Sequence, residues 1–575
     1  MTDDLLVLGP LLRYVDETSA AVWVEVAGRG TVTVTLQPSA GDAVSGPTFS
    51  AHTFSAHTFT VHGHHYALVE IDGLEPGSST EYTVRFDDDV VWPPPRSTQP
   101  PSRIRTLAPG RRCRLMFGSC RTSVPHDAEH NRTHGIDVLR AYALAMRDLD
   151  ESDWPDLVLF LGDQVYADET SDEMQAFIDA RRDIEQPPYK ELKDYEEYAH
   201  LYRLAWTEPA NRWLLSTLPI AMIFDDHDVR DDWNTSRAWR DEIRRSSWWH
   251  DRVVGALASY WVYQHLGNLS PADRAADDLW AEVRRLGREG DAGKLLDEFA
   301  DRSDDDPAYA RWSYHRDLAG SRLVVLDTRS ARMLDEGDRR MLNEAEMTWF
   351  ESLATGGADH LLIASSVPYM LPMGLHHLEA WNEGVAAGSW GPRAGRWAET
   401  LRQGVDLEHW AAFQKSFQRV AQLTLAVARG ERGPAPATVT FLGGDVHHSY
   451  LAEAHTGRRR HRFSRRGGYS RGSEQSRVLQ VVCSPIRNPL PRVIRFASAA
   501  AAYGLAWPMG RLAARSASVV DPPFRWSMTD GPWFDNAIAL LDLDGRRGRV
   551  SWLTADLRDG EPEPSSALIR SATLR

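Results

Sequence analysis

Cysteine is scarce in this chain, and its scarcity excludes a fold held together by disulfides. Only Cys113, Cys120 and Cys483 occur among 575 residues, whereas small secreted domains that depend on disulfides are dense in cysteine. Hydrophobic residues make up 42% of the chain, and 21 residues are tryptophan. A large apolar core is therefore expected to stabilise the fold.

The chain also lacks long apolar runs and an excess of positive charge. No run reaches the about 18–20 apolar residues that cross a bilayer. Residues 1–6 carry two acids where a secretory or twin-arginine leader has basic residues. We therefore expect no transmembrane segment and a cytoplasmic location, with secretion left open. The formal net charge of −16 argues against a nucleic-acid partner, and a phosphate substrate would need metal ions to reverse this charge locally.

Residues 1–108 have the pattern of a small all-β domain. Stretches at 20–26, 31–36, 66–71 and 80–86 alternate in polarity or are rich in β-branched residues, and glycine and proline turns separate them. Short strands at this spacing predict a sandwich of the immunoglobulin or fibronectin type.

Strands separated by helices follow, and they predict an α/β layer fold. We expect a catalytic domain at 109–560, a helical insert around 235–310 and a tail at 561–575. The basic stretch at 458–476 is either a solvated loop or an electrostatic guide for anionic substrates.

Four apolar runs in the α/β region each end in a group of metal-ligand residues. They are 114–121, 157–166, 220–228 and 438–448. Each begins as a buried strand and ends in polar side chains that a core would not accommodate. Because open α/β sheets place their sites at the carboxyl ends of strands, we expect these ends to converge on a pair of metal ions that activates water. The converging residues would be Cys120, Asp163, Tyr166, Asp226, His227, Asp445 and His447.

Several of these residues have a distinct predicted chemistry. The carboxylate of Asp163 can bridge two cations, and a tyrosinate from Tyr166 favours a hard trivalent ion such as Fe(III). His227 lies among acids that favour its protonated form, so it can donate a proton to a leaving oxygen. Arg230 is the nearest counter-charge in the sequence. Residue type alone leaves open that Asp163 caps a helix and that Cys120 is an inert buried thiol.

In this order the four groups resemble the alkaline phosphatase D (PhoD-like) branch of the calcineurin-like metallophosphoesterases. The resemblance covers roughly residues 5–555 and rests on Phe-Gly-Ser-Cys, Leu-Gly-Asp-Gln-Val-Tyr, Asp-Asp-His-Asp and Gly-Gly-Asp-Val-His-His. It implies a four-layer αββα core with a dinuclear metal site, preceded by the all-β sandwich. It also implies a metal-dependent hydrolase that acts on a small-molecule phosphoester.

The resemblance assigns roles to the site residues. The ligands of an Fe(III)-type ion would be Cys120, Asp163, Tyr166 and His447. The ligands of a second ion, calcium by analogy, would be Asp163, Asp226 and Asp445. Manganese and zinc are alternative metals. The expected catalytic residues are His227, Asp228 and Arg230, and the expected substrate contacts are Arg121 and His448.

Two further functions stay open at the level of sequence. One is hydrolysis of another phosphodiester, such as a cyclic nucleotide or a phospholipid, and the other is binding without catalysis on the same fold. The separate histidine motif of the wider family has no match, and Ser365 and Ser366 lie where it is expected.

Overall fold

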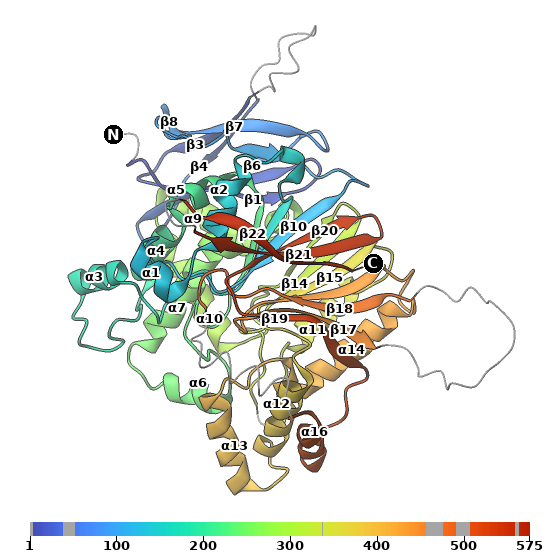
Figure 1. Ribbon diagram of the computed structural model, residues 1–575. Helices are drawn as coiled ribbons and strands as arrows, with labels where there is room; N and C mark the ends of the chain where they lie inside the picture. The colour runs from blue at the N-terminus through green and yellow to red at the C-terminus, as the bar shows by residue number, and fades with distance from the viewer. Residues whose placement is uncertain are drawn as a thin grey trace, which may run out of the picture.

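The described part of the chain forms four β-sheets, two in the N-terminal region and two in the remainder (Figure 1). This description comes from a computed structural model that describes residues 4–37, 52–335, 337–455, 475–489, 506–557 and 563–574. The basic stretch at 458–476 lies almost entirely outside the described residues.

Two antiparallel sheets form the N-terminal sandwich. One has the strand order β1-β2-β6-β5, and the other has the order β4-β3-β7-β8, with β9 paired to β7. Val22, Val34 and Val84 from the two sheets meet in the core between them. The strands are β1 (Leu6–Val15), β2 (Ala20–Val26), β3 (Thr31–Gln37), β4 (His52–His57), β5 (Phe59–Val61), β6 (His64–Ile71), β7 (Ser79–Phe86), β8 (Asp89–Trp92) and β9 (Arg103–Arg105).

The burial of β2 shows that the sandwich packs closely against the rest of the chain. All 7 residues of β2 are buried, whereas a sheet with one solvated face buries only alternate residues. Val22 and Val24 face the sandwich core, and Trp23 belongs to the core that continues into the α/β region. The sheet β1-β2-β6-β5 therefore lies between its partner sheet and the α/β region.

Two mixed sheets form that α/β region. Their orders are β12-β11-β10-β20-β21-β22 and β13-β14-β15-β16-β18-β17-β19. The two sheets face each other, and the indole N–H of Trp552 in β21 donates to the carbonyl of Val482 in β18 (3.0 Å). The strands are β10 (Cys113–Gly118), β11 (Leu157–Leu161), β12 (Ile220–Ile223), β13 (Tyr314–Leu318), β14 (Ser321–Leu326), β15 (His360–Ser365), β16 (Thr438–Gly443), β17 (Ser449–His455), β18 (Arg477–Val482), β19 (Arg525–Trp533), β20 (Ile538–Asp544), β21 (Arg547–Asp556) and β22 (Ser565–Thr573).

Helices cover the outer faces of both sheets, which confirms the predicted four-layer αββα core. Helix α2 packs against β21 and β22, and α14 packs against β16 and β18, where Phe417 meets Ile363 and Phe441. The helices are α1 (Ala128–His134), α2 (Val138–Met146), η1 (Glu151–Asp153), α3 (Asp172–Arg181), α4 (Tyr195–Trp206), α5 (Pro209–Thr217), α6 (Arg237–Ile243), α7 (Trp249–Tyr260), η2 (Trp261–His265), α8 (Pro271–Ala275), α9 (Asp278–Glu289), α10 (Gly293–Asp305), α11 (Glu344–Leu353), α12 (Met373–Ala386), α13 (Pro392–Gly404), η3 (Trp410–Ala412), α14 (Gln414–Ala428) and α16 (Ala506–Ser516). Within the described ranges, no helix has both the length and the apolar character needed to cross a bilayer.

The region expected to be a helical insert contains α6 to α10, and η2 continues α7 as a turn of π-helix. The segment expected to be a tail, 561–575, instead contains β22, which pairs along β21. The prediction missed this strand because its small side chains alternate too weakly to give a strand pattern. Pairing with β21 supplies its backbone hydrogen bonds.

Candidate metal centre

The candidate site lies where β10, β11, β12 and β16 end. Strands β10, β11 and β12 run parallel, so their carboxyl ends lie at one edge of their sheet. The loops that follow are tied together through the backbone. The N–H of Cys120 donates to the carbonyl of Gly162 (3.4 Å), and the N–H of Asp445 donates to the hydroxyl of Ser119 (3.0 Å). The four loops thus meet between the two sheets.

Left-handed backbone is concentrated in these loops. The φ angle is +57° at Cys120, +50° at Asp163, +62° at Asp445 and +48° at His447. Such a conformation costs a non-glycine residue about 1–3 kcal/mol and persists where the surroundings enforce it. All of these residues are metal ligands in the sequence-based prediction, so the strain lies at the candidate site.

Two glycines allow the loops to approach each other. Gly162 has a φ of +95°, and a Cβ placed on it would lie 2.5 Å from the Cβ of Asp225. A Cβ on Gly444 would overlap with Ser119. Side chains at either position would force the carboxylate-bearing loops apart.

Four aspartates from these loops form one carboxylate cluster. Asp163, Asp225, Asp226 and Asp445 each offer an oxygen, and these oxygens lie within 4.8 Å of one another. Asp163 and Asp225 are fully buried, and Asp226 is 5% exposed. In the described structure Asp163 Oδ1 and Asp225 Oδ2 have no hydrogen-bond partner. Buried polar atoms in native proteins are rarely left unpaired, so these oxygens are free to bind a cation.

The electrostatics of the cluster also call for cations. Burial, the Cys120 thiol and the neighbouring Asp225 raise the pKa of Asp163 well above its usual range. Burial likewise raises the pKa of Asp225, although the Arg329 guanidinium opposes it. A bound cation would reverse these shifts and keep the carboxylates ionised.

Sulfur, phenol and imidazole donors border the cluster. The thiol of Cys120 lies 3.2 Å from Asp163 Oδ2, and burial, with the Asp445 charge, raises its pKa to about 12. Tyr166 is buried, and its ring centroid lies 4.7 Å from that of His227. Burial lowers the pKa of His447 to about 4, so its imidazole is neutral, and Nδ1 has no hydrogen-bond partner among the described residues. A neutral imidazole and a thiol are suitable metal ligands once the thiol loses its proton.

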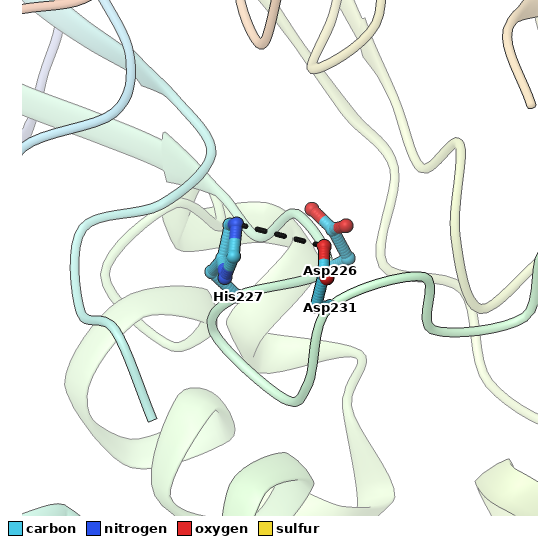
Figure 2. A group of neighbouring side chains, drawn as sticks. All are labelled: Asp226, His227 and Asp231. Atoms are coloured by element: carbon cyan, nitrogen blue, oxygen red, sulfur yellow. Dashed lines mark ion pairs between the residues drawn. The ribbon is translucent and has the colours of Figure 1, made fainter. Parts of the chain in front are cut away.

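His227 lies beside Asp226 and is partly exposed. Its Nδ1 lies 2.9 Å from Asp168 Oδ1, and its Nε2 lies 3.8 Å from Asp231 Oδ1. Figure 2 shows the ring facing Asp231, with Asp226 alongside. Burial alone would lower the pKa of His227, but the carboxylates of Asp168, Asp226 and Asp163 together raise it well above the usual value. Asp168 therefore favours the imidazolium and fixes the orientation of the ring.

The counter-charge of the cluster is Arg329, which lies just beyond β14. Its buried guanidinium pairs with Asp225 and lies 3.1 Å from Asp226 Oδ1. A third carboxylate, Glu408, lies 2.6 Å from the same guanidinium. One guanidinium shared in this way leaves the cluster with excess negative charge, which is costly in a buried site. The donor set therefore fits metal ions.

Asp445 has its own support from the segment that precedes α14. His409 Nε2 lies 3.2 Å from Asp445 Oδ2, and His409 Nδ1 lies 2.8 Å from Glu379 Oε1. Burial opposes the ionised form of Asp445, but the adjacent His409 and the Arg329 charge together outweigh it and lower the pKa of Asp445. This histidine orients one oxygen of Asp445 and leaves the other to the cluster.

Asp228 joins two of the loops through backbone hydrogen bonds. Its Oδ2 accepts the N–H groups of Asp163 (2.9 Å) and Asp225 (2.8 Å), and its Oδ1 accepts the N–H of Val165 (3.4 Å). The carboxylate therefore faces the backbone and fixes the distance between the loops after β11 and β12.

The structure does not bring Arg121 and Arg230 to the carboxylate cluster. The guanidinium of Arg121 is buried against Asp137 (2.8 Å) and donates to the carbonyl of Ala205 (2.9 Å). Arg230 pairs with Glu191 (3.2 Å). His448 follows the ligand loop, and its ring packs 5.5 Å from that of Phe534.

Sequence reasoning missed several residues that the structure gathers here. They are Asp168, Asp225, Arg329, Glu379, Glu408 and His409. Arg329 had a usable signal, because Asp327-Thr-Arg329 follows an apolar strand as the four ligand groups do. Glu379 and His409 come from the helical region around α12 and α13, where no strand end or motif marks them.

The protein has two facing mixed sheets with a carboxylate cluster at their strand ends. This combination defines its class as a candidate metallohydrolase. The sequence profile of the PhoD-like phosphatase family matches residues 132–492. The chain therefore belongs to the PhoD-like phosphatase family. Residues 3–104 match a domain of unknown function, DUF7800. No curated protein sequence matches the chain.

Two solved structures resemble the fold. A structure of PhoD shares 13% identity over 99% of this chain and 90% of that chain, with a TM-score of 0.59. A purple acid phosphatase from yellow lupin (Lupinus luteus) seeds shares 10% identity over 97% of this chain and 73% of that chain, with a TM-score of 0.46. The likeness to PhoD extends over the sandwich as well as the α/β region.

Proposed function

We propose that this protein is a metal-dependent phosphoester hydrolase that acts on small-molecule phosphoesters. The observation that carries the proposal is the cluster of four aspartates, whose oxygens lie within 4.8 Å of one another and of which Asp225 and Asp226 share the Arg329 guanidinium. Family membership supports the same reaction class. The net charge of −16 favours a small substrate over a nucleic acid.

The donors divide into two sets by chemistry. Cys120, Tyr166 and His447, with Asp163, suit an Fe(III)-type ion, because thiolate and tyrosinate are strong donors to it. Asp226 and Asp445, again with Asp163, suit a hard cation such as calcium; manganese and zinc are the alternatives. Asp225 is a further oxygen donor to the second set. When bound, such ions supply a water nucleophile at neutral pH and neutralise charge on the phosphoryl oxygens.

His227 is the proposed proton donor to the leaving oxygen. Asp168 engages Nδ1, so the Nε2 edge of the ring is the one free to act on a substrate. Asp231 lies next to that edge, and its N–H donates to Asp168 (2.6 Å). Asp168 thus links the histidine to the loop that carries Asp231.

The remaining predicted residues take supporting roles in this proposal. Asp228 orients Asp163 and Asp225 through their backbone. Arg121 stabilises the loop after β10 through its ion pair with Asp137. Arg230 stabilises the loop after β12 through its ion pair with Glu191. A substrate contact remains proposed for His448, which lies next to the proposed ligand His447.

Hydrolysis of an aryl phosphate and of an aryl phosphodiester tests the function. We expect turnover of at least one of them by metal-loaded protein and loss of turnover after chelation. Preference for the diester would direct the search to cyclic nucleotides or phospholipids. Metal-loaded protein that hydrolyses neither ester would contradict the proposal and favour a binding protein on the same fold.

A further inference from the structure

The sandwich reaches the candidate metal centre through one buried arginine. Arg13 lies in β1 and is fully buried. Its guanidinium crosses out of the sandwich and donates to the carbonyls of Tyr263 (3.1 Å) and Gln264 (2.5 Å). Both carbonyls belong to η2, at the end of a helix where the last carbonyls lack a partner within the helix. Arg13 therefore supplies the missing donors.

The same guanidinium fixes Asn268, which in turn holds β12. Arg13 Nη2 donates to Asn268 Oδ1 (3.2 Å). Asn268 accepts the N–H of Met222 (3.0 Å) and donates to the carbonyl of Met222 (2.7 Å). Because β12 is the edge strand of its sheet, this amide takes the place of a neighbouring strand. Strand β12 leads directly into Asp225 and Asp226.

A second path runs from η2 to the loops themselves. The side chain of Gln264 donates to Tyr202 (3.0 Å) and to Asp228 Oδ1 (3.5 Å). Asp228 holds the backbone N–H groups of Asp163 and Asp225. The contacts therefore run without a break from Arg13 to the backbone of two proposed ligands.

Space around Arg13 is tight, which shows that its position is enforced. A Cβ added to Gly267 would overlap with the Arg13 guanidinium. Residue 267 must therefore be glycine for the arginine to lie where it does.

We propose that the N-terminal sandwich positions the metal centre, and that Arg13 is the positioning residue through which it acts. This gives a role to a domain whose family has none assigned. The inference rests on the proposed function only in treating Asp163 and Asp225 as ligands.

The first test is hydrogen exchange on the metal-free, full-length protein. Arg13→Met should speed exchange of the amides in 157–168 and 220–230 by about tenfold to a hundredfold, because buried acceptors lose their donors and the loops open more often. Gln264→Met should speed exchange in 157–168 and leave that of Met222 near the wild-type rate, since Asn268 still holds β12. If Arg13→Met does not fold, Arg13→Lys should show the same pattern more weakly.

Tyr82→Phe is the matched control. The buried Tyr82 hydroxyl also crosses from the sandwich and donates to a backbone carbonyl, that of Ser216 (2.6 Å), but this carbonyl belongs to α5 and not to η2 or β12. We expect its exchange in both segments to stay within about twofold of wild type. Unchanged exchange in Arg13→Met, or equal acceleration in Tyr82→Phe, would overturn the inference.

Metal affinity gives a second readout. Titration of metal-free protein with Mn²⁺ should give about 10–100-fold weaker binding for Arg13→Met than for Tyr82→Phe, the usual effect of losing support behind a ligand. Equal affinities would count against Arg13. A wild-type protein that binds no Mn²⁺ and hydrolyses no phosphoester would instead contradict the proposed function, and the exchange pattern would still decide the inference.

Discussion

At the scale of single residues, the proposed ligands have strained backbone, and other side chains orient them and shift their pKa values. Asp163 and Asp445 adopt left-handed backbone, and each has a supporting group behind it, Asp228 and His409 respectively. His227 has Asp168 in the same role. Because the supporting groups come from other segments, the chemistry of each ligand depends on the fold and not on its motif alone.

Loss of His227 should depend on the leaving group. If His227 protonates the leaving oxygen, His227→Ala should cost an alkyl phosphate about 10²–10⁴-fold in kcat/KM. A nitrophenyl phosphate should lose far less, because its leaving group needs little protonation. Steady-state kinetics on both esters checks this. Equal losses with unchanged metal content would rule out the acid role.

Tyr166 should give the iron-loaded protein a colour. Tyrosinate bound to Fe(III) produces a charge-transfer absorption band in the visible range. Tyr166→Phe should abolish that band, and the far-ultraviolet circular dichroism should stay unchanged because the ring still fills its buried site. Iron-loaded wild-type protein without such a band would show that Tyr166 is only a core residue.

The carboxylates of the site were more predictable than their partners. Asp163, Asp226 and Asp445 directly follow apolar strands, and strand ends share one edge of a sheet. Arg329 and Glu408 meet them only after residues far apart in sequence fold together. Arg230 was expected as counter-charge because it is near in sequence, but the structure gives that position to Arg329.

At the scale of elements, the sheet β1-β2-β6-β5 contacts helix α4 of the α/β region through charged as well as apolar side chains. His64 at the start of β6 lies 2.7 Å from Glu25 in β2 and 2.9 Å from Glu196 in α4. Its two carboxylate partners are remote in the chain, which is why sequence alone does not reveal the contact.

These contacts predict a pH-dependent stability. Burial alone would lower the pKa of His64, but the carboxylates of Glu196 and Glu25 outweigh it and raise the pKa from 6.5 to about 9. Since the folded-state pKa is the higher one, the ion pairs stabilise the fold fully below pH 6.5 and lose their effect as the pH rises through about 9. His64→Gln should reduce the free energy of unfolding by roughly 1–3 kcal/mol just below pH 6.5, where both glutamates are still ionised, after allowing for solvent around Glu196.

Chemical denaturation at several pH values measures this difference. It should shrink toward zero between pH 6.5 and about 9. His57→Gln is the control, because the contact of His57 within the described residues is to the Thr31 hydroxyl (3.2 Å) and not to a carboxylate. If the loss of unfolding free energy in His64→Gln stays constant across this pH range, the contribution of His64 comes from packing and not from charge.

The elements themselves were predictable where their patterns were strong. β2, β11, β12 and β16 are short apolar or alternating runs, and they fold as the patterns predict. β1 was missed because Gly9 and Pro10 interrupt its apolar pattern and Arg13 lies within it. Arg13 interrupts the apolar pattern of β1 because its guanidinium hydrogen-bonds to η2 and not to other residues of the sandwich.

At the scale of the whole molecule, the sandwich and the α/β region share one continuous core. Trp23 of β2 packs with Tyr263 of η2, with ring centroids 5.3 Å apart, and Tyr66 joins them. The sequence predicts the two regions as successive domains. Its periodicity does not reveal that β2 is buried on both faces, which is what joins the two cores. The two regions therefore form one structural unit around the site.

The central claim is that the carboxylate cluster binds metal, and elemental analysis of the purified protein tests it most directly. Wild-type protein should contain iron and a second cation. Asp163→Ala should lose both to background, because its carboxylate serves both sets of donors. Asp241→Ala, which removes an exposed aspartate paired with Arg237 (2.9 Å), should keep the wild-type content. Asp163→Ala protein that retains the wild-type metals and hydrolyses phosphoesters normally would contradict the account.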